Sequence, residues 1–311
     1  RYDALLVMGW QTMAHVQLIG AARTSGLPLL IRGESNLLRR PAGGVRAAVR
    51  RFVWTPLRSA LYRRMFARVD AFITIGRRNA DYYRSFGVPD AKLFFAGYGV
   101  DNSHFALGAE QAAAARIRLR GEHGIGMESV VFVSSAKIIP RKRPLDLLTA
   151  FATLGGGGRD AHLVYLGDGA QRGEVEREAR RLGVRDRVTV TGFVNQRSIP
   201  DWYAASDCLV LPSDTLETWG LVVNEAMAAG LPVIVSDAAG CAPDLVIASE
   251  NGYTYPCGDV SALASRMIDI LERGAPARRS MGERSRQIVA AFSPEHAAAV
   301  IADAVVELVK H

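Results

Sequence analysis

Two carboxylates eight residues apart give the sequence its clearest chemical signal. Glu217 and Glu225 bound the stretch Glu-Thr-Trp-Gly-Leu-Val-Val-Asn-Glu, between an expected strand at 208–212 and an expected helix over 219–229. Eight residues span about 2.2 helical turns, so both carboxylates can lie on one side of the helix start and face one cleft. Open parallel sheets bind ligands at their carboxyl edge, where this stretch is expected to lie.

Trp219, Gly220 and Leu221 lie at the expected start of that helix. Backbone N–H groups there have no acceptor within the helix and favour an anion. Carboxylates on both sides of a phosphate site suit a ligand with hydroxyls at both ends of a diphosphate, which is the layout of a nucleotide sugar. Taken alone, the two residues could equally be a capping carboxylate and a surface helix residue. The strand–loop–helix–Gly–Pro–strand setting favours the ligand site.

A basic loop follows the strand expected at 130–135. It reads Ser-Ala-Lys-Ile-Ile-Pro-Arg-Lys-Arg-Pro over 135–144 and contains Lys137 and Lys142. Cations at this edge would neutralise a diphosphate leaving group, an electrostatic role that is needed most in the transition state. A basic loop by itself is commonly a solvated turn. Combined with the two glutamates downstream, it favours a catalytic site.

These motifs resemble the donor domain of retaining GT-B glycosyltransferases of family 4 (group 1), which assemble bacterial glycans. In that family the E-x7-E motif accompanies a G-R-x-x-x-x-K loop. Lys142 falls on the Lys position and Lys137 stands where Arg is more usual, which keeps the charge but loses the bidentate fork. The resemblance implies catalytic roles for Glu217 and Lys142, and donor contacts for Lys137, the segment 219–221 and Glu225.

Three further segments carry the resemblance, which is strongest over 129–240 and weakest over 36–66. Gly192-Phe193 resembles the family's segment bordering the nucleobase, and Gly167-Asp-Gly169 resembles its G-D-G loop. The segment 97–105 resembles P-N-G-V-D-x-x-x-F at the domain boundary, with Tyr98 at the Asn position. The family often has a His after the strand expected at 28–32. Here Gly33 and Glu34 stand there, and Glu34 is our candidate for the residue facing the sugar.

The resemblance implies an α/β protein of GT-B architecture, with two Rossmann-like parallel-sheet domains facing a cleft. We expect an acceptor-side domain over 1–105, a linker over 106–128, a donor domain over 129–285 and a C-terminal helix over 286–311 that packs back towards the first domain. The chain opens on an apolar strand, and the glycine-rich loop that follows the family's first strand is missing. We therefore expect an N-terminal truncation and an incomplete first domain.

The implied reaction moves a hexose from a UDP- or GDP-linked sugar to a glycan or lipid-linked acceptor with retention of configuration. The departing diphosphate oxygen would deprotonate the acceptor. No metal or other cofactor is expected, because the sequence has no D-x-D, no HExxH and no Cys/His cluster. Cys208, Cys241 and Cys257 are scattered without a CxxC pair, which is typical of reduced thiols in a cytoplasmic protein.

Composition and charge are those of a soluble globular protein. The 311 residues are 49% hydrophobic and 22% charged, with a net charge of +7. The segment 32–84 holds thirteen arginines against three carboxylates. Nucleic acid, an anionic membrane or a phosphorylated substrate could each explain this basic region, as could a solvated helix face.

The segment 45–69 interleaves arginine with apolar and aromatic residues, and Pro56 is expected to divide it into two helical pieces. Such basic amphipathic helices favour anionic interfaces. We therefore expect a cytoplasmic protein with weak peripheral association at the inner membrane face.

The alternatives are an inactive GT-B-like fragment and a basic protein that binds an anionic surface or nucleic acid. Nucleic acid is not expected, because no RRM, KH or helix-turn-helix signature is present. A dehydrogenase is disfavoured because no G-x-G-x-x-G follows a strand.

Overall fold

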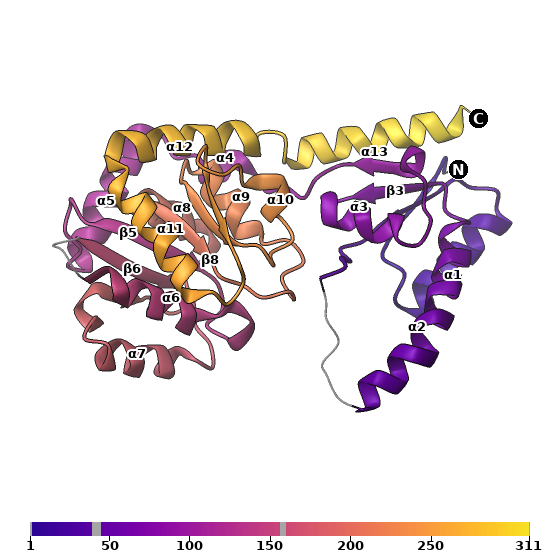
Figure 1. The fold of residues 1–311 in the computed structure, drawn as a ribbon. Coiled ribbons are helices and arrows are strands. Elements are labelled where there is room, and N and C mark those ends of the chain that lie inside the picture. The colour runs from indigo at the N-terminus through magenta and orange to yellow at the C-terminus, as the bar shows by residue number, and fades with distance from the viewer. Residues whose placement is uncertain (1, 39–44, 156–159, 311) are drawn as a thin grey trace. The chain divides into compact units, whose positions relative to one another are not determined.

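A computed structural model describes residues 2–38, 45–155 and 160–310, and only the backbone of 45–55. The chain divides into two compact units (Figure 1). The first comprises Arg1–Tyr98 together with Phe292–His311, and the second comprises Gly99–Ala291.

The first unit contains a parallel sheet with strand order β1-β2-β3-β4. Its strands are β1 (Leu5–Met8), β2 (Leu29–Arg32), β3 (Ala71–Thr74) and β4 (Leu93–Phe95). Its helices are α1 (Met13–Thr24), α2 (Val45–Phe66), α3 (Arg77–Arg84) and α13 (Pro294–Val309), with a 3₁₀ turn η1 (Asp90–Lys92). Gly26 ends α1 with a positive φ of 65°, a conformation that glycine adopts without strain.

Hydrophobic residues cover both faces of this sheet. Trp10, Phe66, Phe72 and Tyr83 form an aromatic cluster on one side. On the other side α13 packs Ala304 and its partly buried apolar neighbours against β2 and β3. By length and composition alone, the helical segment Gly274–Val309 could cross a membrane. The structure instead divides it into α12 and α13, and α13 uses part of its apolar surface to cover the sheet.

The second unit contains a parallel sheet with strand order β10-β9-β8-β5-β6-β7. Its strands are β5 (Val130–Ser135), β6 (Ala161–Leu166), β7 (Val188–Val190), β8 (Cys208–Leu211), β9 (Val233–Ser236) and β10 (Gly252–Tyr255). Its helices are α4 (Asn102–Phe105), α5 (Ala109–Glu122), α6 (Pro144–Ala152), α7 (Arg172–Arg181), α8 (Ile199–Ala204), α9 (Leu221–Ala228), α10 (Ala242–Leu245), α11 (Val260–Glu272) and α12 (Gly274–Val289). Its 3₁₀ turns are η2 (Pro140–Lys142), η3 (Thr153–Gly155), η4 (Arg185–Arg187) and η5 (Gln196–Ser198).

The central strands β5, β8 and β9 are buried along their whole length, as expected for a parallel sheet covered on both faces. Of the helices around it, α6, α7 and α11 pack together, and α5 packs on α8 while α9 packs on α4 and α12. The strands therefore form a rigid platform, and the loops at their carboxyl ends can hold side chains in fixed positions.

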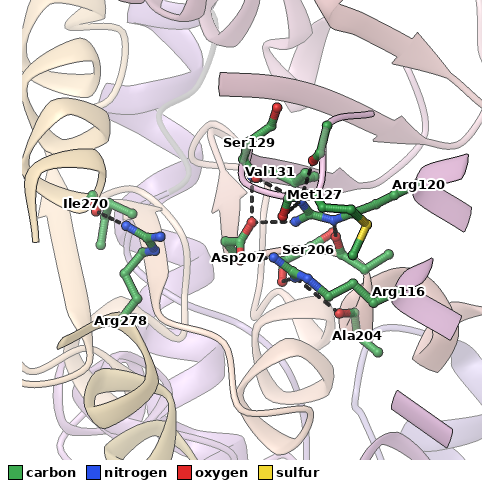
Figure 2. A network of polar contacts seen from close by, with 12 residues as sticks. Arg116, Arg120, Met127, Ser129, Val131, Ala204, Ser206, Asp207, Ile270 and Arg278 are labelled. Atoms are coloured by element: carbon green, nitrogen blue, oxygen red, sulfur yellow. Dashed lines mark hydrogen bonds and ion pairs between the residues drawn. The ribbon is translucent and has the colours of Figure 1, made fainter. Parts of the chain in front are cut away.

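A buried arginine ties α5 to the amino edge of this sheet (Figure 2). The guanidinium of Arg120 is fully buried and donates to Asp207 Oδ2 at 2.7 Å. It also donates to the carbonyl oxygens of Gly126, Met127, Ser129 and Ala205. Burial lowers its pKa, and the Asp207 charge acts in the opposite direction. These contacts fix α5 to the strand starts at β5 and β8.

The predicted α/β architecture with two parallel sheets is confirmed. Two details differ from the sequence predictions. Pro56 does not divide the basic segment, because α2 continues through it as one helix. Residues 106–128, expected as a linker, contain α5, which the arginine contacts hold on the second unit. The glycine run 155–158 also predicts a flexible loop, and this segment lies outside the described residues except for Gly155.

Candidate functional site

The core of the candidate site is an ion pair at the carboxyl edge of the second sheet. Lys142 Nζ donates to Glu217 Oε2, and the two side chains are only 13% and 11% exposed. Lys142 ends the turn η2 after β5, whereas Glu217 lies in the loop between β8 and α9. The fold thus brings together the two residues that sequence motifs predicted as catalytic partners.

Glycines of the Gly167-Asp-Gly169 loop hold the lysine-bearing loop in place. Ile138 N–H donates to Asp168 O at 2.9 Å, and Gln171 N–H donates to Ile138 O at 3.0 Å. A Cβ at Gly167 would lie 2.1 Å from the Ala136 carbonyl oxygen, and one at Gly169 would lie 2.4 Å from the Ile138 oxygen. Both positions require glycine because the two backbones touch. Lys137 lies in this braced loop with its side chain exposed.

A second close backbone contact braces the loop that carries Glu217. Gly240 N–H donates to Glu217 O at 3.0 Å, and Cys241 N–H donates to Trp219 O at 3.1 Å. A Cβ at Gly240 would lie 1.8 Å from Thr218 O, so only glycine fits. This contact was not found from the sequence, because the segment 237–241 shows no motif that points to the Glu217 loop.

The amino end of α9 lies just after Glu217. Gly220 precedes the helix with a φ of 104°, and Leu221 is its first residue. The Trp219 indole is 2% exposed and donates Nε1–H to Asn224 Oδ1 at 2.8 Å, so its ring is part of the core. The first turn contains no acidic side chain. The helix end therefore remains suited to an anion next to the Lys142–Glu217 pair.

Glu225 lies in a different environment. Its side chain accepts from Tyr203 Oη at 2.8 Å and from Gln196 Nε2 at 3.3 Å. Burial raises the pKa of Glu225, and the hydrogen bonds from Tyr203 and Gln196 act to lower it. The sequence placed both glutamates on one cleft, but the partners of Glu225 in the structure are Tyr203 and Gln196 rather than Lys142. Sequence reasoning missed these two partners, since neither lies in a recognisable motif.

Gly192 and Phe193 lie after β7. Gly192 has a φ of 75° and forms an isolated antiparallel bridge with Gly167, which joins the two glycine-containing loops. Phe193 is 84% exposed, although it is a large apolar residue. An exposed aromatic ring held by a fixed backbone is able to stack on a planar ligand group.

Glu34 belongs to the first unit and has a partner that the sequence did not indicate. Tyr98 Oη donates to Glu34 Oε1 at 2.7 Å, and Arg32 Nη2 donates to Gly97 O at 3.0 Å. Burial, followed by the Glu34 hydrogen bond, raises the pKa of Tyr98 to about 12. A Cβ at Gly33 would lie 2.2 Å from Trp10 Cζ3, so the indole ring leaves no room for a side chain there. Glu34 and Tyr98 together present a carboxylate and a phenol at the carboxyl edge of this sheet.

Within residues 2–38, 45–155 and 160–310, no group of three or more His, Cys, Asp or Glu side chains could hold a metal ion. Lysines and arginines of the 135–144 loop supply the cations described at the carboxyl edge of the second sheet, and the N–H groups that start α9 add partial positive charge. That chemistry suits a phosphate-containing ligand directly.

Comparison with known proteins gives a consistent result. Residues 115–288 match the family described as glycosyl transferases group 1. The chain is 31% identical over 250 residues to D-inositol 3-phosphate glycosyltransferase of Xylanimonas cellulosilytica, covering 78% of this chain and 58% of that protein. It is 29% identical over 222 residues to the GDP-mannose-dependent alpha-(1-6)-phosphatidylinositol monomannoside mannosyltransferase of Mycolicibacterium smegmatis, covering 70% and 56%.

Among solved structures, the fold is similar to that of Anabaena Alr3699/HepE in complex with UDP. The TM-score is 0.77 at 21% identity, covering 97% of this chain and 78% of the Anabaena chain. The chain spans about half the length of the curated relatives it matches.

Proposed function

Because this chain belongs to the glycosyl transferases group 1 family, we propose that it transfers a hexose from a nucleotide-diphosphate sugar to a glycan or lipid-linked acceptor, with retention of anomeric configuration. The observation that supports this most is the Lys142–Glu217 ion pair beside the amino end of α9. It places a cation, a carboxylate and a helix N-terminus at one sheet edge.

In the proposed donor site, Lys142 and the exposed Lys137 bind the diphosphate together with the amides that start α9. Lys142 then exchanges its contact with Glu217 for a phosphate oxygen, and the released carboxylate accepts a hydrogen bond from a sugar hydroxyl. Negative charge grows on the diphosphate as the glycosidic bond breaks, so these cations and amides stabilise the transition state more than the ground state.

Glu225 and Phe193 are proposed to bind the nucleoside. The Glu225 carboxylate accepts from Tyr203 and Gln196, and these contacts fix it to receive a ribose hydroxyl. The exposed Phe193 ring stacks on the base. The mannosyltransferase relative is GDP-mannose-dependent by name, and the Anabaena structure contains UDP. Both UDP- and GDP-linked sugars are therefore candidates for this chain.

Retention is proposed to follow from attack on the face that the leaving group departs from. The acceptor hydroxyl forms the new bond to the anomeric carbon while the diphosphate oxygen leaves and takes the hydroxyl proton. Protein side chains then act by positioning and by charge. Glu34 is our proposed contact to the sugar in the first unit. We propose that the reaction needs no metal or other cofactor.

We further propose a cytoplasmic location with peripheral binding to an anionic membrane. In α2, the side chains described from Pro56 onward include exposed Leu57 and Leu61 and exposed Arg58, Arg63 and Arg64. The part of the predicted basic segment before Pro56 has no described side chains. Flotation with anionic liposomes at low salt should carry the protein, and failure to co-float would contradict this proposal.

The function is tested by incubating the chain with UDP- and GDP-linked hexoses and following release of nucleoside diphosphate. Slow hydrolysis occurs even without an acceptor if the donor site is competent. Early proton NMR spectra of the released hexose give its anomeric configuration, which should match that of the donor. Inverted product, or no release from any donor by a cooperatively folded protein, would contradict the proposal.

A further inference from the structure

A cavity lies in the same unit, at the edge of the sheet opposite the Lys142–Glu217 pair. Its volume is about 350 Å³, and its lining includes Ser129, Asp207 and Pro232. These residues lie immediately before β5, β8 and β9, so the cavity is at the amino edge of the sheet. None of the residues proposed to contact the donor lines this cavity, although Tyr203, the hydrogen-bond partner of Glu225, lines it from α8.

Four arginines line the cavity from two helices. Arg116 comes from α5, whereas Arg278, Arg279 and Arg286 come from α12. Figure 2 shows the guanidinium groups of Arg116 and Arg278 together with Asp207. A volume of this size is in the range of small-molecule sites, which span about 300–1,000 Å³.

The cations outnumber the carboxylates around this cavity. Asp207 binds both Arg116, at 2.9 Å, and the buried Arg120, at 2.7 Å, so one carboxylate serves two guanidinium groups. The hydrogen bonds from Arg278 go to the carbonyl oxygens of Ile270 and Leu271, at 3.4 Å each. Backbone carbonyls satisfy its N–H groups without neutralising its charge. Arg286 contacts Glu283, which does not line the cavity. Besides Asp207, the lining contains the carboxylate of Glu128.

The orientation of α12 adds to this positive potential. The helix begins at Gly274 with no acidic residue in its first turn and no side-chain cap. Ala275 in that first turn lines the cavity, and Arg278 and Arg279 follow one turn later. Cations are unfavourable near the positive end of a helix dipole, whereas an anion is stabilised there. Arg278 bridges two helix ends, because its carbonyl partners Ile270 and Leu271 lie in the last turn of α11. Arg279 is exposed on the next position of α12, and an anion bound there would be stabilised by both guanidinium groups and by the helix end.

From these observations we propose that this amino-edge cavity binds a small phosphate-bearing ligand. The phosphate group accepts hydrogen bonds from Arg278, Arg279 and the first turn of α12. Arg116, held by Asp207, faces the ligand from α5. The shared chemistry admits inorganic phosphate and a sugar phosphate as ligands, and the size of the cavity leaves room for the sugar.

Isothermal titration calorimetry at constant ionic strength tests the proposal with two probes, inorganic phosphate and glucose 6-phosphate. The full chain is compared with Arg279→Gln and Arg278→Gln, and with Lys142→Ala, which alters only the other edge of the sheet. Each arginine substitution should weaken binding about tenfold, as loss of a charge-assisted hydrogen bond implies. Lys142→Ala should leave the affinity unchanged. Arg279 is exposed, so its substitution should not disturb folding.

Tighter binding of glucose 6-phosphate than of phosphate would identify a sugar phosphate as the ligand class. Equal affinities would identify the free anion, and both results support the site. The proposal is overturned if neither probe binds at millimolar concentration, if Arg279→Gln and Arg278→Gln bind as tightly as the unaltered chain, or if Lys142→Ala abolishes binding. The last result would assign the anion to the carboxyl edge.

Discussion

Lys142 and Glu217 lie 75 residues apart in the chain and form an ion pair in which both side chains are almost buried. The lysine ends the β5 loop and the glutamate lies in the β8 loop, so the pair joins two neighbouring strands at their carboxyl ends. Burying two charges is costly unless they are paired. The Lys142 ammonium is therefore already largely removed from water before a ligand binds. A polyanionic ligand at this edge could replace Glu217 as its partner.

Gly240→Ala should destabilise the protein. The new Cβ would lie 1.8 Å from the Thr218 carbonyl oxygen, so the loop that carries Glu217 must move. Overpacking of this kind costs about 1–3 kcal/mol, and urea unfolding measures it. Gly121→Ala is the matched control, because that glycine lies in α5 with open space around it. The control should be neutral or stabilising by about 0.5–1 kcal/mol. Equal effects of the two substitutions would contradict the close contact.

Glu225→Gln should change how stability depends on pH. Burial raises the pKa of Glu225 above its ordinary value of 4.5, so the folded protein binds this proton more tightly than the unfolded chain. The free energy of unfolding of the unaltered protein should therefore fall, relative to that of the variant, as pH rises from about 4.5 towards neutrality. Urea unfolding at several pH values gives this difference. A difference that stays constant, or rises with pH, would show that burial does not penalise the carboxylate.

Phe193→Ala should weaken nucleotide binding without affecting folding. The ring is 84% exposed, so its removal should change stability by less than about 0.5 kcal/mol. Stacking of a base on an aromatic ring contributes about 1–3 kcal/mol, which predicts at least a fivefold loss of affinity. Calorimetric titration with whichever nucleotide the unaltered chain binds measures the loss of affinity. Phe193→Trp keeps an aromatic ring and should retain the affinity. Unchanged binding by the alanine variant would remove Phe193 from the nucleoside site.

Glu34→Gln should lower turnover by about tenfold or more while nucleotide affinity stays the same. The carboxylate lies in the first unit and accepts from Tyr98 at 2.7 Å, and we propose that it contacts the sugar, whereas the nucleotide binds to the second unit. Tyr98→Phe should show a smaller loss, since the carboxylate remains but is less well positioned. Steady-state rates and calorimetry together separate the two effects. If turnover is unaffected in Glu34→Gln, the sugar-facing role is wrong.

The sequence predicted the main parallel strands because they are short apolar runs bounded by glycine, proline and polar residues. Strand β5, expected at 130–135, is observed at Val130–Ser135, and β8, expected at 208–212, is observed at Cys208–Leu211. The prediction that Pro56 divides the basic segment was wrong, because a single missing N–H does not interrupt a helix as long as α2. Strand β10 was not predicted, because Gly252–Tyr255 is short and begins with glycine.

At the site, the motifs predicted that Lys142 and Glu217 would lie at the same edge of the sheet, because parallel strands bring their carboxyl ends together. They did not predict the direct contact between the two side chains. They also could not predict the partners of Glu225. Tyr203 lies on α8 and Gln196 in the turn before it, and only the packing of α8 brings them to α9. The Glu34–Tyr98 contact was not predicted for a different reason: Tyr98 occupies a motif position usually held by another residue, so the motif says nothing about its partner.

The most direct test of the proposed donor site is calorimetric titration of UDP, GDP, ADP and their sugars into the unaltered chain and Lys142→Ala. Arg180→Ala, an equal change of charge on the exposed surface of α7, is the control. We predict binding of one nucleotide and its sugar, weakened at least tenfold in Lys142→Ala and unchanged in Arg180→Ala. Binding that survives intact in Lys142→Ala would contradict the assignment of the Lys142–Glu217 pair as the diphosphate site.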